Sequence, residues 1–292
     1  MSTITEPHVV IPPLGHVNLT RKSVPLCERD LFEDEAMAYT LGQVDVSAFK
    51  AHLLSHDEHI GAANDIWSDE YHDVHNVKLM RPAHDRWGIK KIVFTFCDDF
   101  LSKVLDLPFS QDNEWRKFII PIYDAIGVDE KRIVRSLLAK MPPNVEIPVH
   151  HDTGYWVQYT HRVHVAICTD SAKVNFYVGK TEDDIRKYSF EEGRIVELNN
   201  QAKHAVNNQW DQERIHFIFD YVDDDFPLNR HILKKSEIVR QTRRSIDLVS
   251  EEGNREWPSW LIIGAQKSGT TSLYCHHSVL PPHKNKSTHT GY

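Results

Sequence analysis

The 292-residue sequence has little of what marks several common classes of protein. Its four cysteines lie far apart without a CxxC pair, which argues against a zinc ribbon and against a disulfide-dense secreted scaffold. No apolar run approaches the roughly 20 residues of a membrane-spanning helix, so we expect no membrane partner. The first residues lack the basic and apolar regions of a secretory signal peptide, which leaves the cytoplasm as the default location.

Positive charge is also scarce. The chain has 34 lysines and arginines against 42 aspartates and glutamates, a net charge of −8, whereas a generic nucleic-acid binder is basic. We therefore expect no nucleic-acid partner. With 40% hydrophobic and 26% charged residues the chain can still form a sizeable core, as one large domain or two modest ones. The residue type in unusual abundance is histidine, with 19 copies.

The first half of the chain predicts few regular elements. Residues 44–54 favour a short helix and residues 89–98 a strand. Residues 112–126 favour a helix that begins at Asp112 or Asn113 and ends at Gly127, although Pro121 lies inside it.

From about residue 132 to residue 222 the sequence changes to short, closely spaced strands separated by turn residues. This density predicts an all-β barrel or sandwich. Two of the strands, 162–168 and 214–221, have one apolar face and one face with an Arg-x-His pair. Because side chains alternate sides along a strand, each polar face either contacts water or lines a barrel interior that holds an anion. The repeated pattern favours the interior.

A metal-ligand pattern lies among these strands. His150 and Asp152 point to the same side of an extended segment, and His204 stands where a distant strand begins. Two imidazoles and one carboxylate form the facial triad of non-haem Fe(II) oxygenases, which leaves other metal positions open. The alternative is that His150 and His151 are surface residues at a strand end. A slip of one residue would exchange them, but His151 and Asp152 would then lie on opposite faces, so we expect His150.

Arg214 strengthens the oxygenase interpretation. It follows His204 by ten residues, on the strand expected to run beside it. A guanidinium in this place can hold the distal carboxylate of a keto acid through two parallel hydrogen bonds.

Residues from about 110 to 222 resemble the aspartyl/asparaginyl β-hydroxylase family of Fe(II)/2-oxoglutarate dioxygenases, which includes proline hydroxylases. The resemblance is carried, in order, by Pro148 with His150-x-Asp152, Arg162-Val-His164, Glu192-Gly193-Arg194, His204-Ala-Val-Asn-Asn208 and the strand from Arg214 to Tyr221. The membrane-anchored animal members lack the metal carboxylate. Asp152 therefore puts this sequence nearer the free-standing bacterial-type and proline-hydroxylase branch.

This resemblance implies a mainly β fold, a double-stranded β-helix (jelly roll, cupin-like) with flanking helices. It implies His150, Asp152 and His204 as iron ligands and Arg214 as the partner of the C5 carboxylate of 2-oxoglutarate. Further keto-acid contacts are implied for Arg162 and His164, and a supporting role for Asn208 or Asn207.

The implied activity is Fe(II)- and 2-oxoglutarate-dependent hydroxylation of a free amino acid or of an Asp, Asn or Pro side chain in a peptide. O₂ is consumed, and succinate and CO₂ are released. The partners are then a small-molecule or peptide substrate and O₂. The sequence leaves the substrate, the stereochemistry and the oligomeric state open.

A second motif lies near the C-terminus. Residues 257–274 predict a strand, a glycine loop and a helix start, an arrangement that binds anions through backbone N–H groups. Lysine follows the last glycine in a Walker A loop, whereas here Lys267 precedes Gly269. The loop resembles the 5′-phosphosulfate-binding loop of PAPS-dependent sulfotransferases. Its candidate anion-binding residues are Lys267, Ser268, Gly269, Thr270, Thr271 and Ser272.

Residues 257–292 are too few for a complete sulfotransferase domain, so we expect a truncated, vestigial start of one. PAPS would be a cofactor only if a full domain exists. The expected organisation is a dioxygenase domain at 1–228, a charged linker at 229–256 and this α/β stub. Two alternatives remain open: a sulfotransferase with the barrel as an accessory domain, and a non-catalytic jelly roll that binds a carboxylate ligand.

Further histidines and aromatic residues fit either ordinary packing or a substrate wall. The histidines before the barrel are His72, His75 and His84, near Trp87. The aromatic residues after the metal motif are Tyr155, Trp156 and Tyr159.

Overall fold

The computed structural model describes residues 37–55, 65–76, 84, 86–223 and 225–234. Contacts divide the chain into two units, Met1–Thr242 and Arg243–Tyr292, and all described residues belong to the first. Most of the expected linker and the whole phosphosulfate-type loop, from Lys267 to Ser272, lie outside the described residues. The predicted stub therefore stays a prediction.

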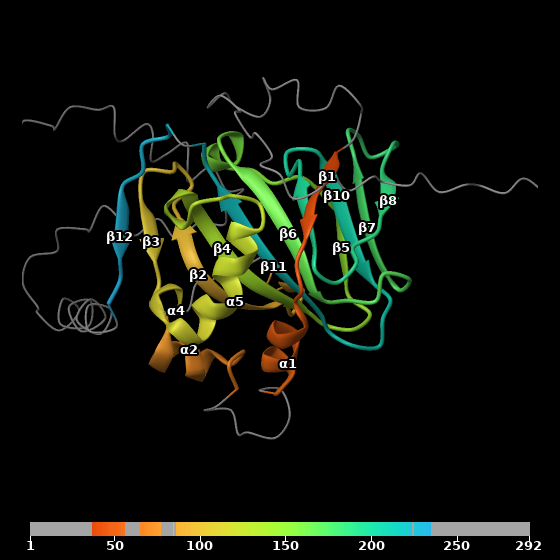
Figure 1. Cartoon of the computed structure of the whole chain (residues 1–292). Helices are drawn as coiled ribbons and strands as arrows, with labels where there is room; N and C mark the ends of the chain where they lie inside the picture. Colours follow the sequence, from red (N-terminus) through yellow and green to blue (C-terminus); the bar gives the residue numbers. More distant parts are fainter. Residues whose placement is uncertain (1–36, 56–64, 77–83, 85, 224, 235–292) are drawn as a thin grey trace, which may run out of the picture. The chain divides into compact units, whose positions relative to one another are not determined.

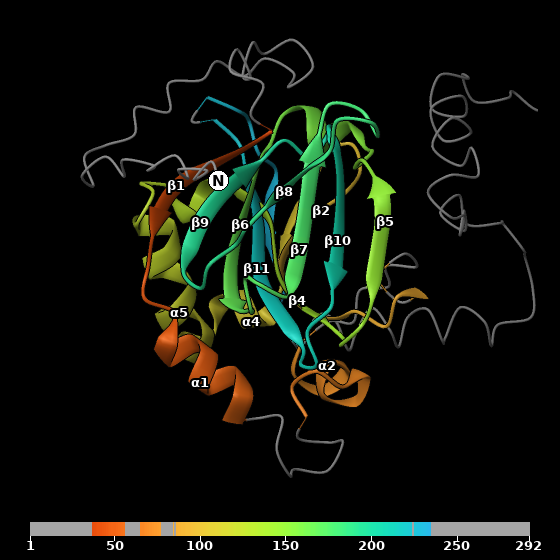
Figure 2. The same ribbon diagram turned by 90° about the vertical axis from the view of Figure 1, so that its right-hand side faces the viewer.

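The β-structure consists of two sheets. The larger has eight strands in the spatial order β1 (Ala38–Gln43), β9 (Arg194–Leu198), β6 (His161–Cys168), β11 (Arg214–Tyr221), β4 (Ile133–Met141), β2 (Lys90–Cys97), β3 (Val104–Asp106) and β12 (Arg230–Ile232). The smaller has four strands in the order β5 (Glu146–His150), β10 (Lys203–Asn208), β7 (Val174–Gly179) and β8 (Arg186–Tyr188). The smaller sheet faces the larger one (Figure 2).

The strand pairing from β4 to β11 is nested. The first of these strands pairs with the last, β5 with β10, β6 with β9 and β7 with β8, always antiparallel. Successive pairs alternate between the two sheets, so the chain winds as a double strand around one core. This topology is the jelly roll that the sequence predicted.

Helices cover the outer face of the larger sheet (Figure 1). They are α1 (Ser47–Ser55), α2 (Asp69–His75), α4 (Pro108–Gln111) and α5 (Asn113–Asp124), with short 3₁₀ turns at Glu130–Arg132 and Tyr155–Gln158. The α5 helix confirms the predicted one, and Asp112 caps it by accepting a hydrogen bond from the backbone N–H of Glu114 (2.9 Å). The described part of the chain contains no helix with the length and apolarity needed to cross a membrane.

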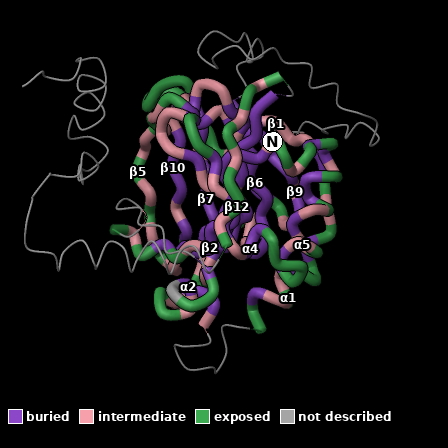
Figure 3. The backbone as a smooth tube through the Cα atoms, turned by 90° about the vertical axis from the view of Figure 1, so that its left-hand side faces the viewer, coloured by how far each residue is buried: buried purple, intermediate pink, exposed green. Residues whose placement is uncertain are grey.

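The two faces of β6 and β11 separate the core into layers. Outward apolar side chains, such as Val163 and Phe217, pack with Trp115 and Ile119 of α5. The inward faces point between the sheets, where Val196 and Phe176 form a second apolar cluster. Figure 3 shows the buried stretches concentrated in these central strands.

The polar residues of the inward faces are buried as well. His164 is 6% exposed, Arg214 4% and His216 0%. The prediction that the two Arg-x-His faces are buried rather than wet is therefore confirmed for these three residues, while the Arg162 side chain is 12% exposed.

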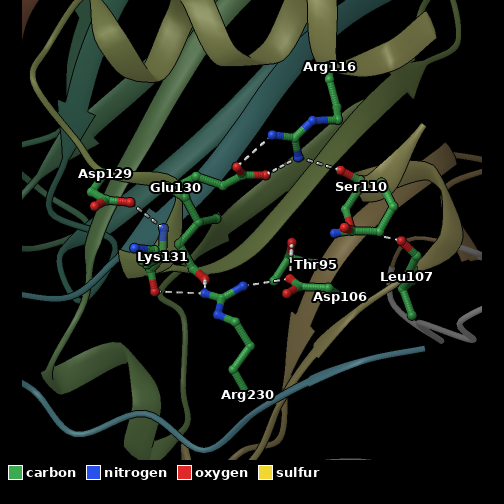
Figure 4. A network of polar contacts seen from close by, with 11 residues as sticks. Thr95, Asp106, Leu107, Ser110, Arg116, Asp129, Glu130, Lys131 and Arg230 are labelled. Carbon is green, nitrogen blue, oxygen red and sulfur yellow. Dashed lines mark hydrogen bonds and ion pairs between the residues drawn. The ribbon is translucent and has the colours of Figure 1, made fainter. Parts of the chain in front are cut away.

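The far edge of the larger sheet is closed by a polar network (Figure 4). β12 pairs in parallel with β3, and Arg230 pairs with Asp106 (2.6 Å). Arg230 also donates to the backbone oxygens of Lys131 (2.9 Å) and Ile133. Asp106 accepts a further bond from Thr95 (3.0 Å). These contacts cover the edge of β3, which would otherwise present unpaired backbone groups.

Candidate metal centre

His150 and His204 meet across two neighbouring strands of the smaller sheet. They are direct partners in the antiparallel register of β5 and β10, and their ring centroids are 4.2 Å apart. His204 is buried and His150 partly exposed. The pairing explains how a histidine at the end of one strand reaches another more than fifty residues away in sequence.

The two imidazoles have the same tautomer, fixed by the same local bond. Nδ1 of His150 donates to the carbonyl oxygen of Pro148 (2.8 Å), and Nδ1 of His204 to that of Ala202 (3.0 Å). Because a carbonyl oxygen only accepts, the hydrogen is on Nδ1 and the lone pair on Nε2. Burial, partly opposed by the charge of Asp152, lowers the pKa of His204 to about 4. A neutral imidazole with a free Nε2 is the form that binds a metal.

Asp152 completes the group from the loop after β5. Its backbone N–H donates to the oxygen of Asn200 (2.8 Å), and its Oδ2 accepts from Arg162 (2.5 Å) and from the Asn200 side chain (3.2 Å). Burial raises the pKa of Asp152, but the charges of Arg162, His204 and His150 outweigh it and hold that pKa well below its usual range. The carboxylate is therefore ionised. Oδ1 has no hydrogen-bond donor among the described residues.

One potential ligand atom from each of His150, Asp152 and His204 lies within 4.8 Å of the others. In the described ranges no other set of three such side chains comes together in this way. Two neutral nitrogens and one carboxylate oxygen fit a divalent ion such as Fe(II), with further coordination positions left open. The exposed His151 is not part of the group.

Arg162 lies between two carboxylates. It donates from Nε and Nη2 to the two oxygens of Asp220 (2.8 and 3.0 Å) and from Nη1 to Asp152. Arg162 and Asp220 are register partners on β6 and β11. Sequence reasoning grouped Arg162 with the keto-acid contacts, and the structure places its guanidinium beside Asp152, a metal-ligand candidate.

Arg214 is a buried cation with no anionic partner in the part of the chain that the structure describes. Its Nη2 donates to Nδ1 of His216 (2.8 Å), while its Nε has no hydrogen-bond partner and no carboxylate pairs with it among the described residues. Burial lowers the pKa of Arg214 to about 9. A buried guanidinium that lacks an acceptor for one of its donors is a candidate binding site for an anionic ligand.

Two buried histidines extend the Arg214 site. Because arginine only donates, Nδ1 of His216 accepts and its hydrogen is on Nε2, which has no partner in the described structure. Neither ring nitrogen of His164 has a partner there, and the two rings lie 6.0 Å apart. Burial lowers the pKa of both well below the usual value. The charges of Arg162 and Arg214 add to this lowering of the His164 pKa, and the charge of Asp152 opposes it.

Sequence reasoning missed Asn200, Asp220 and His216 as site residues. Asn200 lies in the loop between β9 and β10, and the sequence carries no motif there. The second Arg-x-His pair was the available signal for His216. Asn208, the expected support, donates to the backbone oxygens of Pro142 (2.9 Å) and Gln212 (3.1 Å) and stabilises that turn.

Some of the aromatic and histidine candidates for a substrate wall are packed in the fold, and others lie near the metal group or at the surface. Trp87 lies 6.2 Å from the His150 ring, and Tyr155, 47% exposed, lies 4.7 Å from Tyr159. His72 is buried on α2 near Phe109. Trp87 and the two tyrosines thus remain candidates for a substrate wall, whereas His72 packs in the fold.

A family match covers the part of the chain that carries the metal-ligand candidates and Arg214. Residues 111–224 match the family model described as aspartyl/asparaginyl β-hydroxylase. The comparison with curated proteins found no match.

Three solved structures have the following similarity. An oxidoreductase of the 2OG-Fe(II) oxygenase family from Burkholderia pseudomallei is 15% identical, with 46% of this chain and 66% of that one covered and a TM-score of 0.33. The non-heme monooxygenase ThoJ in complex with nickel is 13% identical, with 73% and 96% covered and a TM-score of 0.42. The non-heme alpha ketoglutarate dependent carbocyclase SnoK from nogalamycin biosynthesis is 14% identical, with 72% and 88% covered and a TM-score of 0.39. The chain spans just under two thirds of the first of these proteins.

The family match begins at the end of α4 and ends beyond β11. It therefore includes the eight nested strands, the three metal-ligand candidates and Arg214. Over these residues the chain is similar to the aspartyl/asparaginyl β-hydroxylase family.

Proposed function

We propose that this protein is an Fe(II)- and 2-oxoglutarate-dependent hydroxylase. The observation that carries the proposal is the presence, inside one jelly roll, of a candidate His-Asp-His ligand set and a buried arginine that has no anionic partner among the described residues. The family match over residues 111–224 supports the same activity.

His150, Asp152 and His204 would hold the iron. Bound Fe(II) would supply the binding of O₂ and the oxidising chemistry. The chain contributes two neutral imidazoles and one carboxylate, which together leave the ion a net positive charge. Arg162 balances the charge of Asp152, and the hydrogen bonds from Arg162 and Asn200 orient its carboxylate.

The distal carboxylate of 2-oxoglutarate would bind at Arg214. The guanidinium and the Nε2–H of His216 provide donors with no partner among the described residues. Phe176 and Phe190 pack against His164, so this site is shielded from water. A charge-assisted pair is strong in such surroundings, and a carboxylate there would restore the usual protonation preference of Arg214.

We propose a free amino acid, or an Asp, Asn or Pro side chain of a peptide, as the substrate. It would approach the metal group past Trp87, Tyr155 and Tyr159. Hydroxylation would consume one O₂ and one 2-oxoglutarate and release succinate and CO₂.

The test is succinate formation from 2-oxoglutarate with Fe(II) and a panel of amino acids and Asp-, Asn- or Pro-containing peptides. We expect succinate from wild type with at least one substrate and none from Asp152→Ala. Wild type that forms no succinate with any member of the panel contradicts the proposal.

A non-catalytic carboxylate-binding module is the second candidate, because the Arg214 site alone can bind an anion. It predicts that Asp152→Ala leaves the affinity for 2-oxoglutarate unchanged. The enzyme proposal predicts that the substitution removes metal binding and, with it, the part of the affinity that depends on the metal.

A further inference from the structure

The metal-ligand candidate Asp152 is the partly exposed end of a row of alternating charges, Asp152–Arg162–Asp220, whose other end, Asp220, is buried. We propose that Asp220 is a positioning residue that acts through Arg162 to keep Asp152 in its metal-binding geometry. This inference rests on the metal site of the proposed function and is independent of the keto acid and the substrate.

The geometry of Arg162 divides its donors unequally. Nε and Nη2, which lie on one edge of the planar guanidinium, bind both oxygens of Asp220 at 2.8 and 3.0 Å. Only Nη1 reaches Asp152, at 2.5 Å from Oδ2. The side chains of Arg162 and Asp220 are 12% and 2% exposed, so water does not readily replace either contact.

The way Arg162 divides its donors determines which oxygen of Asp152 is available to a metal. An arginine prefers to bind a carboxylate with two parallel hydrogen bonds, which would occupy both of its oxygens. Since Asp220 takes the two-donor edge, Arg162 binds one oxygen of Asp152 and leaves Oδ1 for the cation. Without the Asp220 charge, the guanidinium is free to turn and form two bonds to Asp152, in competition with the metal.

An aromatic contact holds the guanidinium next to the Asp152 loop. The Arg162 guanidinium lies 5.1 Å from the Trp156 ring, and that of Arg135 lies 3.8 Å from it. A side chain at Gly154 would meet the Trp156 indole at 2.7 Å. The indole thus packs closely on the backbone two residues after Asp152. The loop and the guanidinium keep a fixed relative position as a result.

The test is an anaerobic Co(II) titration of the full chain without 2-oxoglutarate, followed by the d–d absorption bands. We expect Asp220→Asn to bind Co(II) about 10–100-fold more weakly, as for partners of metal ligands elsewhere, and to change the bands. Asp220→Glu, which keeps the charge, should recover part of the affinity. The matched control is Asp223→Asn, because Asp223 is buried like Asp220 but lies just after β11 and bonds to His161 (3.2 Å). It should bind Co(II) like wild type.

A double-mutant cycle separates positioning from general damage. In the Asp152→Ala background, Asp220→Asn should cause no further loss of the residual Co(II) affinity, because Asp220 affects the metal only through Asp152. If Asp220→Asn does not fold, Arg162→Lys, which keeps the charge but not the two-donor edge, takes its place with the same expectation.

Wild-type Co(II) affinity and bands in folded Asp220→Asn would overturn the inference. The inference would also be overturned if Asp220→Asn weakened Co(II) binding as much in the Asp152→Ala background as it does in wild type. Failure of 2-oxoglutarate turnover would contradict only the proposed function, since the titration contains no keto acid. A wild type that binds no Co(II) would overturn both.

Discussion

Arg214 and His216, two residues apart on the inward face of β11, are joined by a hydrogen bond of 2.8 Å from Nη2 to Nδ1. The bond fixes the tautomer of His216 and directs one of the five arginine donors along the strand. In the described structure the Nε of Arg214 and the Nε2 of His216 remain without acceptors. Two adjacent buried donors of this kind form a site for one carboxylate.

Removing the Arg214 charge should therefore weaken co-substrate binding. We expect Arg214→Leu to raise the KM for 2-oxoglutarate by about 100-fold or more, because loss of a buried charged partner costs roughly 2–5 kcal/mol. Co(II) affinity measured without 2-oxoglutarate should be unchanged. The control is Arg194→Ala, since Arg194 pairs with Glu191 at the surface (2.7 Å). An unchanged KM in Arg214→Leu would refute the assignment of the anion site.

The metal assignment predicts different results for two adjacent histidines. His150→Ala should abolish Fe(II) binding at micromolar metal, because it removes one of three protein ligands. His151→Ala should bind Fe(II) like wild type, since His151 is exposed and outside the group. Isothermal titration under anaerobic conditions measures both affinities. Equal losses in the two variants would mean that the strand register is different from the one described.

The buried histidines predict that the metal-free protein is less stable in acid. Burial and the Arg214 charge lower the pKa of His216, and burial with the charges of Arg162 and Arg214 lowers that of His164, relative to an unfolded value of 6.5. The unfolded chain then binds more protons, so stability is fully present above about pH 6.5 and falls as pH decreases below it. Urea unfolding at pH 7 and pH 5 measures this loss.

A variant identifies the source of that acid sensitivity. His216→Gln should show a smaller decrease in the free energy of unfolding between pH 7 and pH 5 than wild type does. If the free energy of unfolding decreased equally in His216→Gln and in wild type, His216 would not be a source of the acid sensitivity.

Gly193, in the Glu-Gly-Arg block, should be essential for stability. Its backbone has φ +77°, and a Cβ there would lie 2.0 Å from the oxygen of Val44. Gly193→Ala should lower the free energy of unfolding by about 3 kcal/mol or more, since backbone strain alone costs roughly 1–3 kcal/mol. Gly127→Ala is the control: its φ is +67° but nothing lies within 4 Å, so only the conformational cost of about 1–2 kcal/mol applies. Thermal or urea unfolding that ranks the two variants equally would contradict the close contact.

The sequence predicted those features that depend on local periodicity. His150 and Asp152 share a side because they are two residues apart, and the alternation in 162–168 and 214–221 identified the buried faces. The sequence left the start of the 112–126 helix open between Asp112 and Asn113, and the structure shows Asp112 as the cap.

Features that depend on strand pairing and register were beyond the sequence. The expectation that the strand of Arg214 runs beside that of His204 was wrong, because β10 pairs with β5 and β7 while β11 pairs with β4 and β6 in the other sheet. The pairing of Arg162 with Asp220 requires that β6 and β11 are neighbours with those residues opposite each other. The approach of Asn200 to Asp152 depends on the course of a loop. The free Nε2–H of His216 follows from a tautomer that only the Arg214 contact fixes.

The most direct test of the central claim is an anaerobic Fe(II) titration of wild type and His204→Ala in the presence of 2-oxoglutarate. If His150, Asp152 and His204 hold Fe(II) while the keto acid binds it, wild type should develop the weak visible charge-transfer band of the iron–keto-acid complex. His204→Ala should not. Absence of the band in wild type, or an equal band in both proteins, would contradict the account.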